Sequence, residues 1–126
     1  MPVLVDTSVW IDYLRNGKKS EKVDFLIDEN IVAINDLILA ELVPFLKIRN
    51  QREIINILYA IDLLKIEIDW SEIIDFQTKC LNDGINGIGI PDLIIAQNSK
   101  QHRCEIYSFD NHFRLMQKTL DLLLFP

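Results

Sequence analysis

Short apolar runs alternate with longer amphipathic segments along most of this chain. An uninterrupted apolar run such as Val3–Val5 is typical of a buried parallel strand, whereas apolar residues spaced three and four apart indicate a helix. The runs that predict strands are 3–5, 31–34, 64–68, 105–109 and 122–125. The segments that predict helices are 8–14, 21–29, a helix from 37 that extends through at least 45, 51–63, 70–82, 92–101 and 111–118.

This alternation predicts the fold class. Parallel strands need crossover connections, and the amphipathic segments supply helices for that purpose. We therefore expect an α/β fold, a three-layer α/β/α arrangement with a central, mostly parallel sheet. The chain of 126 residues is long enough for one core and too short for two, so a single domain over residues 1–126 is expected.

Polar residues at the predicted boundaries suit helix caps. Ser20 precedes the helix at 21–29, and either Asn35 or Asp36 can open the helix that follows the second strand. Asp69 and Glu72 have the three-residue spacing of a capping box.

Composition narrows the class of protein. Hydrophobic residues make up 49% of the chain and charged residues 25%, which is typical of a folded globular protein. Charges interrupt the apolar segments well before the ~20 residues that cross a membrane, so no membrane association is expected. The N-terminus has no basic region or cleavage site of a signal peptide, which favours the cytoplasm. Cys80 and Cys104 stand without a CxxC motif and predict two buried free thiols.

The formal net charge of −6 argues against non-specific binding of nucleic acid through bulk charge. It is compatible with a metal-dependent nuclease, because bound cations neutralise an acidic site locally. Positive charges also cluster in two places and are either a solvated surface or contacts for phosphates. These two groups are Arg15, Lys18, Lys19 and Lys22, and Lys47, Arg49 and Arg52.

Four carboxylates stand in places that do not suit a plain core. Asp6 and Asp110 each follow an apolar strand, and Asp92 opens an apolar helix after a loop with two glycines. Glu41 interrupts a helix that is apolar almost all round. Pro44 lies one turn further on and should kink this helix or loosen its hydrogen bonds.

These acids are expected to meet. Parallel strands place Asp6 and Asp110 at the same edge of the sheet, and a helix that follows a parallel strand begins there, which adds Glu41. The position of Asp92 follows less directly. Several carboxylates in one crevice repel each other unless a cation binds them, and Mg²⁺ or Mn²⁺ prefers such oxygen ligands.

Each acid also has a structural interpretation. Asp6 could cap its helix, Asp92 could interact with a helix dipole, and Asp110 could form a turn. His112 could touch substrate, although a structural or surface role is the commoner one, and His102 is expected to be exposed. Aspartates on polar helix faces or in turns are interpreted as surface residues, namely Asp12, Asp62, Asp75, Asp83 and Asp121.

The same residues carry a family resemblance. Val-Asp-Thr-Ser-Val-Trp-Ile-Asp at 5–12, Leu-Ala-Glu-Leu at 39–42, Ile-Pro-Asp-Leu-Ile-Ile-Ala-Gln at 90–97 and Tyr-Ser-Phe-Asp-Asn-His-Phe at 107–113 span nearly the whole chain. In this order they resemble the PIN-domain ribonucleases, and more closely the VapC-type toxins of toxin–antitoxin pairs. The resemblance implies a PIN-like fold and an endoribonuclease that leaves a 3′-hydroxyl and a 5′-phosphate.

The resemblance also implies roles for particular residues. Asp6 and Asp92 would hold the principal Mg²⁺ or Mn²⁺, and Glu41 and Asp110 would complete the site and orient or deprotonate the attacking water. Ser8 or Thr7 would be the hydroxyl that braces the site. A toxin implies a cognate antitoxin. The apolar surface of helices 20–29 and 37–61 predicts a homodimer, an antitoxin groove, or both. Two departures are Pro44, where a helix former is usual, and Gln97, where a small residue is common and which is expected to matter less.

Three other interpretations stay open. A haloacid-dehalogenase-like phosphatase also begins with a strand and Asp, but it needs a second Asp where this chain has Ser8. A receiver-like domain needs a lysine after a late strand, and the late strand here ends in Ser-Phe-Asp. A PIN fold that only binds a partner protein is the non-enzymatic interpretation.

Overall fold

The computed structural model describes residues 1–126 and contains one sheet of four parallel strands. The strands are β1 (Val3–Val5), β2 (Val32–Ile34), β3 (Asp62–Leu63) and β4 (Glu105–Tyr107). They lie in the order β3-β2-β1-β4, and every neighbouring pair is parallel. The parallel sheet predicted from the sequence is confirmed.

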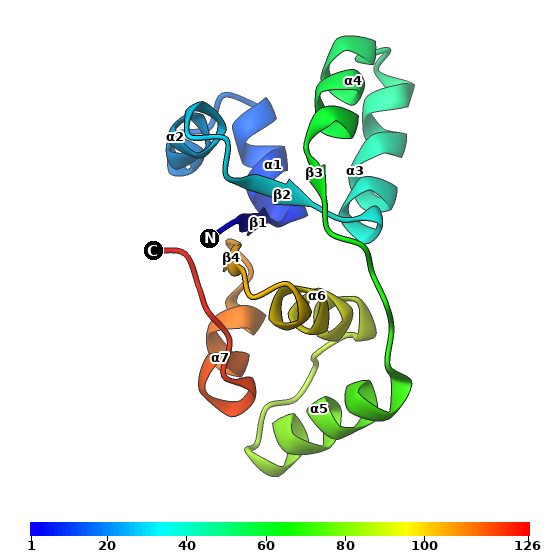
Figure 1. Ribbon diagram of the computed structural model, residues 1–126, viewed down its shortest axis with the longest axis vertical. Coiled ribbons are helices and arrows are strands. Elements are labelled where there is room, and N and C mark those ends of the chain that lie inside the picture. Colours follow the sequence, from blue (N-terminus) through cyan, green and yellow to red (C-terminus); the bar gives the residue numbers. More distant parts are fainter.

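Seven α-helices flank the sheet. Figure 1 shows α1 to α4 on one side of the strands and α5 to α7 on the other, which confirms the three-layer arrangement. The helices are α1 (Thr7–Leu14), α2 (Lys22–Asp28), α3 (Asp36–Ile48), α4 (Arg52–Ala60), α5 (Trp70–Asn82), α6 (Ile90–Gln101) and α7 (Asn111–Leu120). A short 3-10 turn, η1 (Lys18–Ser20), precedes α2. No helix is both long and apolar enough to cross a membrane.

The core lies between these layers. Every residue of β1 and β2 is buried, because helices cover the sheet on both faces. Thirty-one buried hydrophobic residues form one cluster. Cys80 and Cys104 belong to it as free thiols, as predicted, and burial raises the pKa of Cys104 to about 11.

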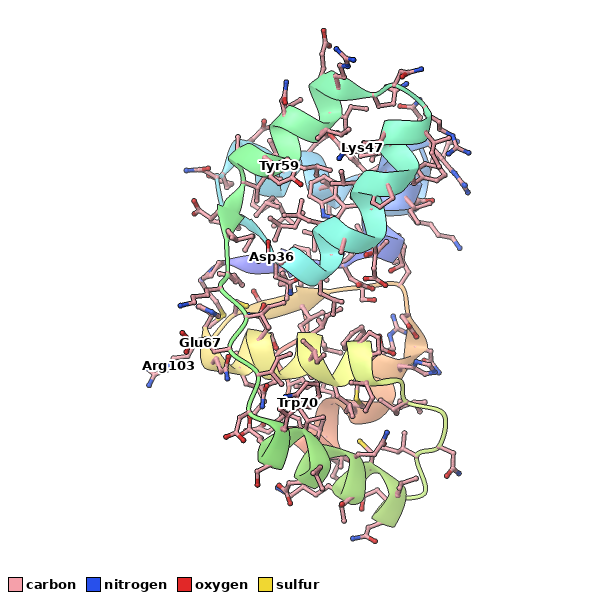
Figure 2. All side chains as sticks on the ribbon, turned by 90° about the vertical axis from the view of Figure 1, so that its right-hand side faces the viewer. Asp36, Lys47, Tyr59, Glu67, Trp70 and Arg103 are labelled. Atoms are coloured by element: carbon pink, nitrogen blue, oxygen red, sulfur yellow. The ribbon has the colours of Figure 1, made fainter.

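The predicted strand at 64–68 is wrong. The strand near residues 64–68 lies instead at Asp62–Leu63, and α4 ends at Ala60 rather than at residue 63. Residues 64–69 are an extended segment that crosses from one helical layer to the other, where Figures 1 and 2 show it beside α6. The alternating pattern detected an extended backbone, but a pattern cannot tell whether the partner of that backbone is a strand or a helix.

The predicted last strand at 122–125 is reduced to a single parallel bridge between Ile106 and Leu124. Its backbone still follows β4, because the Ile106 N–H donates to the Leu123 carbonyl at 2.8 Å and the Phe125 N–H donates to the Ile106 carbonyl at 2.9 Å. The predicted strand at 105–109 also ends early, at Tyr107.

In the turn between α1 and α2, Ser20 and Asp12 do not have the roles predicted from the sequence. Ser20 does not cap α2; its hydroxyl donates to Asp12 Oδ2 at 2.7 Å and to the Gly17 carbonyl at 3.3 Å. Asp12 is therefore partly buried rather than a surface residue. This pair of contacts fixes the turn that carries η1.

Three side-chain amides, Asn35, Gln97 and Asn98, form what we call the carboxamide cluster. Asn35 caps α3, as predicted, by accepting from the Ile38 N–H at 2.9 Å, and its Nδ2 donates to Asn98 Oδ1 at 3.0 Å. Asn98 Nδ2 lies 3.4 Å from the Leu64 carbonyl and 3.1 Å from that of Lys65. These bonds attach α6 to the crossing segment and to the start of α3.

Gln97 ties the start of α5 to α6. Its Oε1 accepts from the Asp69 N–H at 3.1 Å, while its Nε2 donates to the Asp69 carbonyl at 3.1 Å and to Glu72 Oε1 at 2.8 Å. Gln97 therefore contributes to the fold, since its side chain is 1% exposed and its amide group is hydrogen-bonded at both ends. Asp69 caps α5 through the Glu72 N–H, as predicted.

The helix that carries Glu41 is two-sided rather than apolar all round. Leu39, Leu42 and Leu46 are buried, whereas Ala40, Glu41 and Pro44 are exposed. The helix continues through Pro44 to Ile48. It tolerates the proline because both Pro44 and Ala40, whose carbonyl loses its helical donor, lie on the exposed side.

Candidate active site

The carboxyl ends of the parallel strands and the starts of four helices meet at one edge of the sheet. Asp6 follows β1, Asn35 follows β2, and Ser108 follows β4. The Asp6 N–H donates to the Tyr107 carbonyl at 2.9 Å, which joins the ends of β1 and β4. We call the four predicted acids Asp6, Glu41, Asp92 and Asp110 the acidic edge.

Asp6 is the most buried of these acids, with 7% of its surface exposed. It occupies the N-cap position of α1 but makes no capping hydrogen bond. Its Oδ2 instead accepts from the Ser108 hydroxyl at 2.7 Å and from the Ser8 hydroxyl at 3.2 Å. The capping interpretation therefore does not account for this carboxylate.

Ser8 and Ser108 brace the loop that follows β4. Their hydroxyl oxygens lie 3.3 Å apart. The Phe109 N–H donates to Ser8 Oγ, and the Asp110 N–H donates to Ser108 Oγ, each at 3.0 Å. One hydroxyl network thus holds Asp6 and the backbone of Asp110 together.

Glu41 reaches the edge from α3. Its Oε1 accepts from the Thr7 hydroxyl at 3.0 Å, so Thr7 braces Glu41 while Ser8 braces Asp6. Burial raises the pKa of the Glu41 carboxyl, the charges of Asp6 and Asp92 raise it further, and the Thr7 bond opposes the shift. The carboxylate is accessible to solvent, and its surroundings favour the protonated form.

Asp92 lies in the first turn of α6. Burial raises the pKa of its carboxyl, and the negative charges of Asp110 and Asp6 act in the same direction. The hydrogen bond with His112, 2.8 Å between Nδ1 and Oδ2, opposes this shift. The placement of Asp92 was the least direct expectation, yet the structure brings it into electrostatic contact with the other acids.

Asp110 has a structural role as well as a place in the edge. It caps α7 by accepting from the His112 N–H at 2.9 Å. The structural role is therefore that of a helix cap rather than the predicted turn former. Its Oδ1 also lies 3.4 Å from His112 Nδ1.

His112 is the residue whose position the sequence reasoning underestimated. Its hydrogen bond to Asp92 raises the pKa of the imidazole, and Asp110 contributes to the same shift. Ligand atoms of Asp92, Asp110 and His112 all lie within 4.8 Å of one another. The only signal in the sequence was its position two residues after Asp110. His102, by contrast, is exposed as expected and contacts the Lys65 carbonyl.

The chemistry of this donor set fits a hard divalent cation. The acidic edge offers carboxylate oxygens, and two of its members have pKa values that burial and mutual repulsion raise. A cation would relieve that repulsion, and Mg²⁺ or Mn²⁺ commonly binds through one or two carboxylates and water.

Comparisons with known proteins identify the family. The chain belongs to the PIN-domain family, whose model matches residues 3–118. This match favours the PIN interpretation over the phosphatase and receiver alternatives. A comparison with curated protein sequences finds no match.

Solved structures share the fold at low sequence identity. VapBC2 from Rickettsia felis, bound to a DNA fragment from its promoter, superimposes with a TM-score of 0.77 at 18% identity, covering 99% of this chain and 98% of the other. DNA-bound VapBC from Salmonella typhimurium gives 0.76 at 15% identity, covering 99% and 97%. FitAcB from Neisseria gonorrhoeae gives 0.68 at 21% identity, covering 98% and 96%.

Proposed function

We propose that this protein is a metal-dependent endoribonuclease and the toxin of a type II toxin–antitoxin pair. The observation that carries the proposal is the acidic edge, where four carboxylates from four different segments meet outside the carboxyl ends of β1 and β4. The PIN-domain family match supports hydrolysis of RNA phosphodiester bonds. An RNA substrate would place this activity in the cytoplasm.

In this proposal Asp6 and Asp92 hold the principal Mg²⁺ or Mn²⁺, and Glu41 and Asp110 complete the site directly or through water. Such an ion, when bound, lowers the pKa of its water and stabilises charge on the phosphodiester. Glu41 has a raised pKa, which suits a group that accepts a proton from the attacking water. Ser8 holds Asp6 in place.

His112 acts as a positioning residue. Its Nδ1 contacts Asp92 Oδ2 at 2.8 Å, which engages that oxygen and fixes the rotation of the carboxylate. Groups that orient a metal ligand in this way strengthen metal binding without touching the ion themselves.

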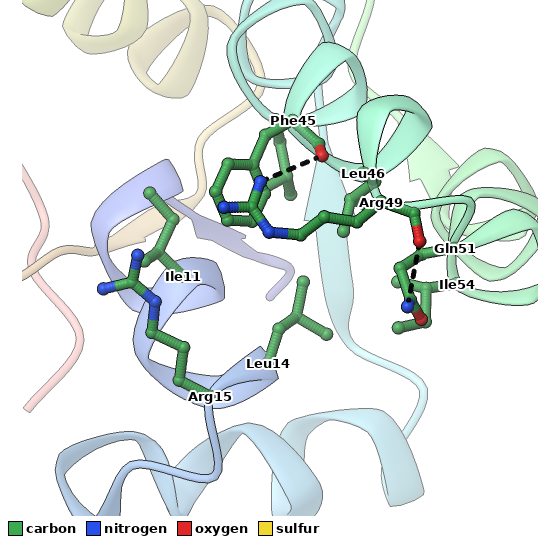
Figure 3. A pocket seen from close by; sticks show the side chains of 9 residues that line it. Ile11, Leu14, Arg15, Phe45, Leu46, Arg49, Gln51 and Ile54 are labelled. Atoms are coloured by element: carbon green, nitrogen blue, oxygen red, sulfur yellow. Dashed lines mark hydrogen bonds between the residues drawn. The ribbon is translucent and has the colours of Figure 1, made fainter.

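An antitoxin is the proposed protein partner. The solved neighbours include VapBC complexes, and a hollow of about 260 Å³ opens between α1, α3 and α4 (Figure 3). Ile11, Phe45 and Ile54 are among its apolar lining residues, and the Arg49 guanidinium lies 3.6 Å from the centroid of the Phe45 ring. An apolar groove with a cation at its margin suits an amphipathic segment of a partner protein.

A homodimer is also proposed. Helix α5 leaves Trp70, Ile74 and Leu81 exposed at 57%, 67% and 55%, and their spacing places them on one face of the helix. Exposed apolar faces of this kind commonly mark protein interfaces. Sedimentation of the wild type and of Ile74→Asp tests this point, because loss of the dimer in the variant is the expected result.

The experiment that tests the activity is cleavage of total cellular RNA by purified, antitoxin-free protein with Mg²⁺, with Mn²⁺ and with EDTA. We expect cleavage only with a divalent cation and its loss in Asp6→Asn. Asp75→Asn is the matched control, because Asp75 is exposed on α5 and pairs only with Lys79.

The competing interpretation is a PIN fold that binds a partner without cutting RNA. Well-folded wild type that cuts no RNA with either cation would favour it. Cation binding without cleavage would do so as well.

A further inference from the structure

A hollow of about 420 Å³ lies directly beside the acidic edge. Its wall is built from the end of β4, from α7, from the C-terminal segment and from the turn that contains η1. Asp110 is the one acidic side chain that lines it, whereas three cationic side chains do so, Lys19, Lys22 and Arg114. In a chain of net charge −6, this is a local concentration of positive charge.

The cations of this hollow are available to a ligand. Neither Lys19 nor Arg114 forms a salt bridge with a carboxylate. Lys22 contacts only the Pro126 carbonyl oxygen and the face of Phe125. A smaller adjoining hollow of about 210 Å³ is lined by Lys19, Arg114 and Phe109 together.

The turn that carries Lys19 is held in place. The Tyr107 hydroxyl at the end of β4 donates to the Lys19 carbonyl at 3.2 Å. Ser20, the next residue, bonds to the Asp12 carboxylate. These contacts hold the backbone at Lys19, so its side chain extends into the hollow from a fixed Cα position.

An aromatic ring lines both hollows together with these cations. Phe109 precedes Asp110, is 40% exposed and lines both hollows. It packs against Tyr107 at a ring distance of 5.6 Å and an interplanar angle of 88°, and its N–H is bonded to Ser8. A ring that is fixed at its backbone and exposed to solvent provides a preorganised surface for stacking.

We propose that this hollow binds an unpaired segment of the RNA next to the bond that is cut, with a base stacked on Phe109 and phosphates contacted by Lys19 and Arg114. The inference rests on the proposed nuclease function and extends it to a particular path for the substrate. Stacking on aromatic side chains between cations is how proteins bind single strands without reading sequence.

Single-stranded RNA is favoured over a protein partner at this place because the hollow leads to Asp110. A phosphodiester in the acidic edge continues into the neighbouring nucleotides, which need cations and stacking surfaces of this kind. A duplex does not fit the stacking role, because its bases are already stacked on one another.

The test measures binding apart from cleavage. A short fluorescein-labelled oligoribonucleotide of non-self-complementary sequence is titrated with the full chain in EDTA, over a series of salt concentrations. The groove variants are Phe109→Ala, Phe109→Leu, Phe109→Tyr and the double variant Lys19→Gln/Arg114→Gln. Matched controls are Tyr59→Ala on α4 and Arg103→Gln just before β4, both exposed residues outside this hollow; Figure 2 labels both.

Two separate readouts are expected. Phe109→Ala and Phe109→Leu should weaken binding about tenfold while Phe109→Tyr retains it, since a ring and not mere apolar bulk supports stacking. The double variant should lower the slope of log K against log salt by about 0.7 for each lost phosphate contact, whereas Phe109→Leu leaves this slope unchanged. The controls should bind as the wild type does, and circular dichroism confirms that each variant folds.

Several outcomes would overturn the proposal. These are wild-type affinity in Phe109→Leu, an unchanged salt slope in the double variant, or no binding by the wild type at low salt. If the protein cuts RNA but the groove variants bind normally, the nuclease proposal stands and the groove proposal fails. If binding depends on the groove but no RNA is cut, the reverse holds.

Discussion

Helix α6 carries polar side chains in two contrasting environments. Near its start, Asp92 joins the acidic edge, where burial and neighbouring carboxylates raise its pKa. Further along, Gln97 and Asn98 belong to the carboxamide cluster, where donors meet acceptors at 2.8–3.4 Å. Both groups lie in partly or fully buried surroundings, yet only the second is internally balanced.

This difference in hydrogen bonding distinguishes polar groups that stabilise the fold from polar groups that await a ligand. A buried amide with all its bonds made stabilises the fold, because no polar atom loses water without replacement. Carboxylates that lie close together with few hydrogen-bond donors raise the free energy of the metal-free folded state. A bound cation relieves this repulsion and lowers that free energy again. We therefore expect variants of the two groups to affect different measurements.

The largest effect on stability is expected in the carboxamide cluster. Asn98→Ala should lower the free energy of unfolding by about 3 kcal/mol, because it leaves the buried Asn35 Nδ2 and the Leu64 carbonyl without a partner, while the Lys65 carbonyl keeps only its contact with His102. Urea denaturation measures this loss. Asn56→Ala, at an exposed position of α4, is the control. A loss below about 1 kcal/mol would mean that water replaces these bonds.

The next effect is stabilisation by a cation. Mg²⁺ or Mn²⁺ at a hundred times its Kd should stabilise the folded protein by about 2.7 kcal/mol, as measured by thermal unfolding. The folded fraction of Asn98→Ala should retain this increment, whereas Asp6→Asn should lose most of it. An equal increment in both variants would contradict the assignment of the acidic edge.

The stabilisation of the folded protein by a bound cation should depend on pH. The pKa values of Glu41 and Asp92 are raised above their ordinary values of 4.5 and 3.8, so the folded protein binds these protons more tightly than the unfolded chain does. Their contribution to stability is full below the ordinary values and is lost as pH rises through the raised ones. As pH rises through this window, the free energy of unfolding of the metal-free protein should therefore fall, while the stabilisation gained on binding the cation should grow. A cation increment that stays constant with pH would contradict this.

A smaller effect is expected at His112. His112→Ala should lower the affinity for Mn²⁺ about tenfold, because Asp92 loses the contact that orients it. His112→Asn places an amide donor near the former Nδ1 and should recover part of the affinity. Calorimetric titration with Mn²⁺ measures both, and identical affinities in the wild type and both variants would remove His112 from the site.

The smallest effect is expected for Glu41→Gln in the metal-free protein. The amide removes a charge close to Asp6 and Asp92, while its oxygen can still accept from Thr7. The melting temperature in EDTA should stay equal or rise, although cleavage falls. Glu53→Gln on the exposed face of α4 is the control, and a clear drop in melting temperature would show a structural role for Glu41.

Much of this arrangement could be predicted from local pattern. The run Val3–Val5, the caps at Asn35 and Asp69, and the position of Asp6 after a buried strand are short-range features, and the structure contains each of them. The alternating pattern also predicted extended backbone at 64–68, but it did not predict that this segment packs beside α6. Gln97 looked unimportant because nothing near it in sequence indicates that it lies against Asp69, twenty-eight residues away.

The sequence by itself determined the alternation of strands and helices, the parallel sheet and hence the common edge that Asp6 and Asp110 share. These depend on hydrophobic period and chain direction, which are properties of consecutive residues. Only the tertiary structure decided that Asp92 and His112 form a pair, that α6 amides hold the crossing segment, and that Phe109, Lys19 and Arg114 line one hollow. Those contacts join segments that lie far apart in the sequence. They are therefore set by the packing of the layers against each other, and not by local conformational preference.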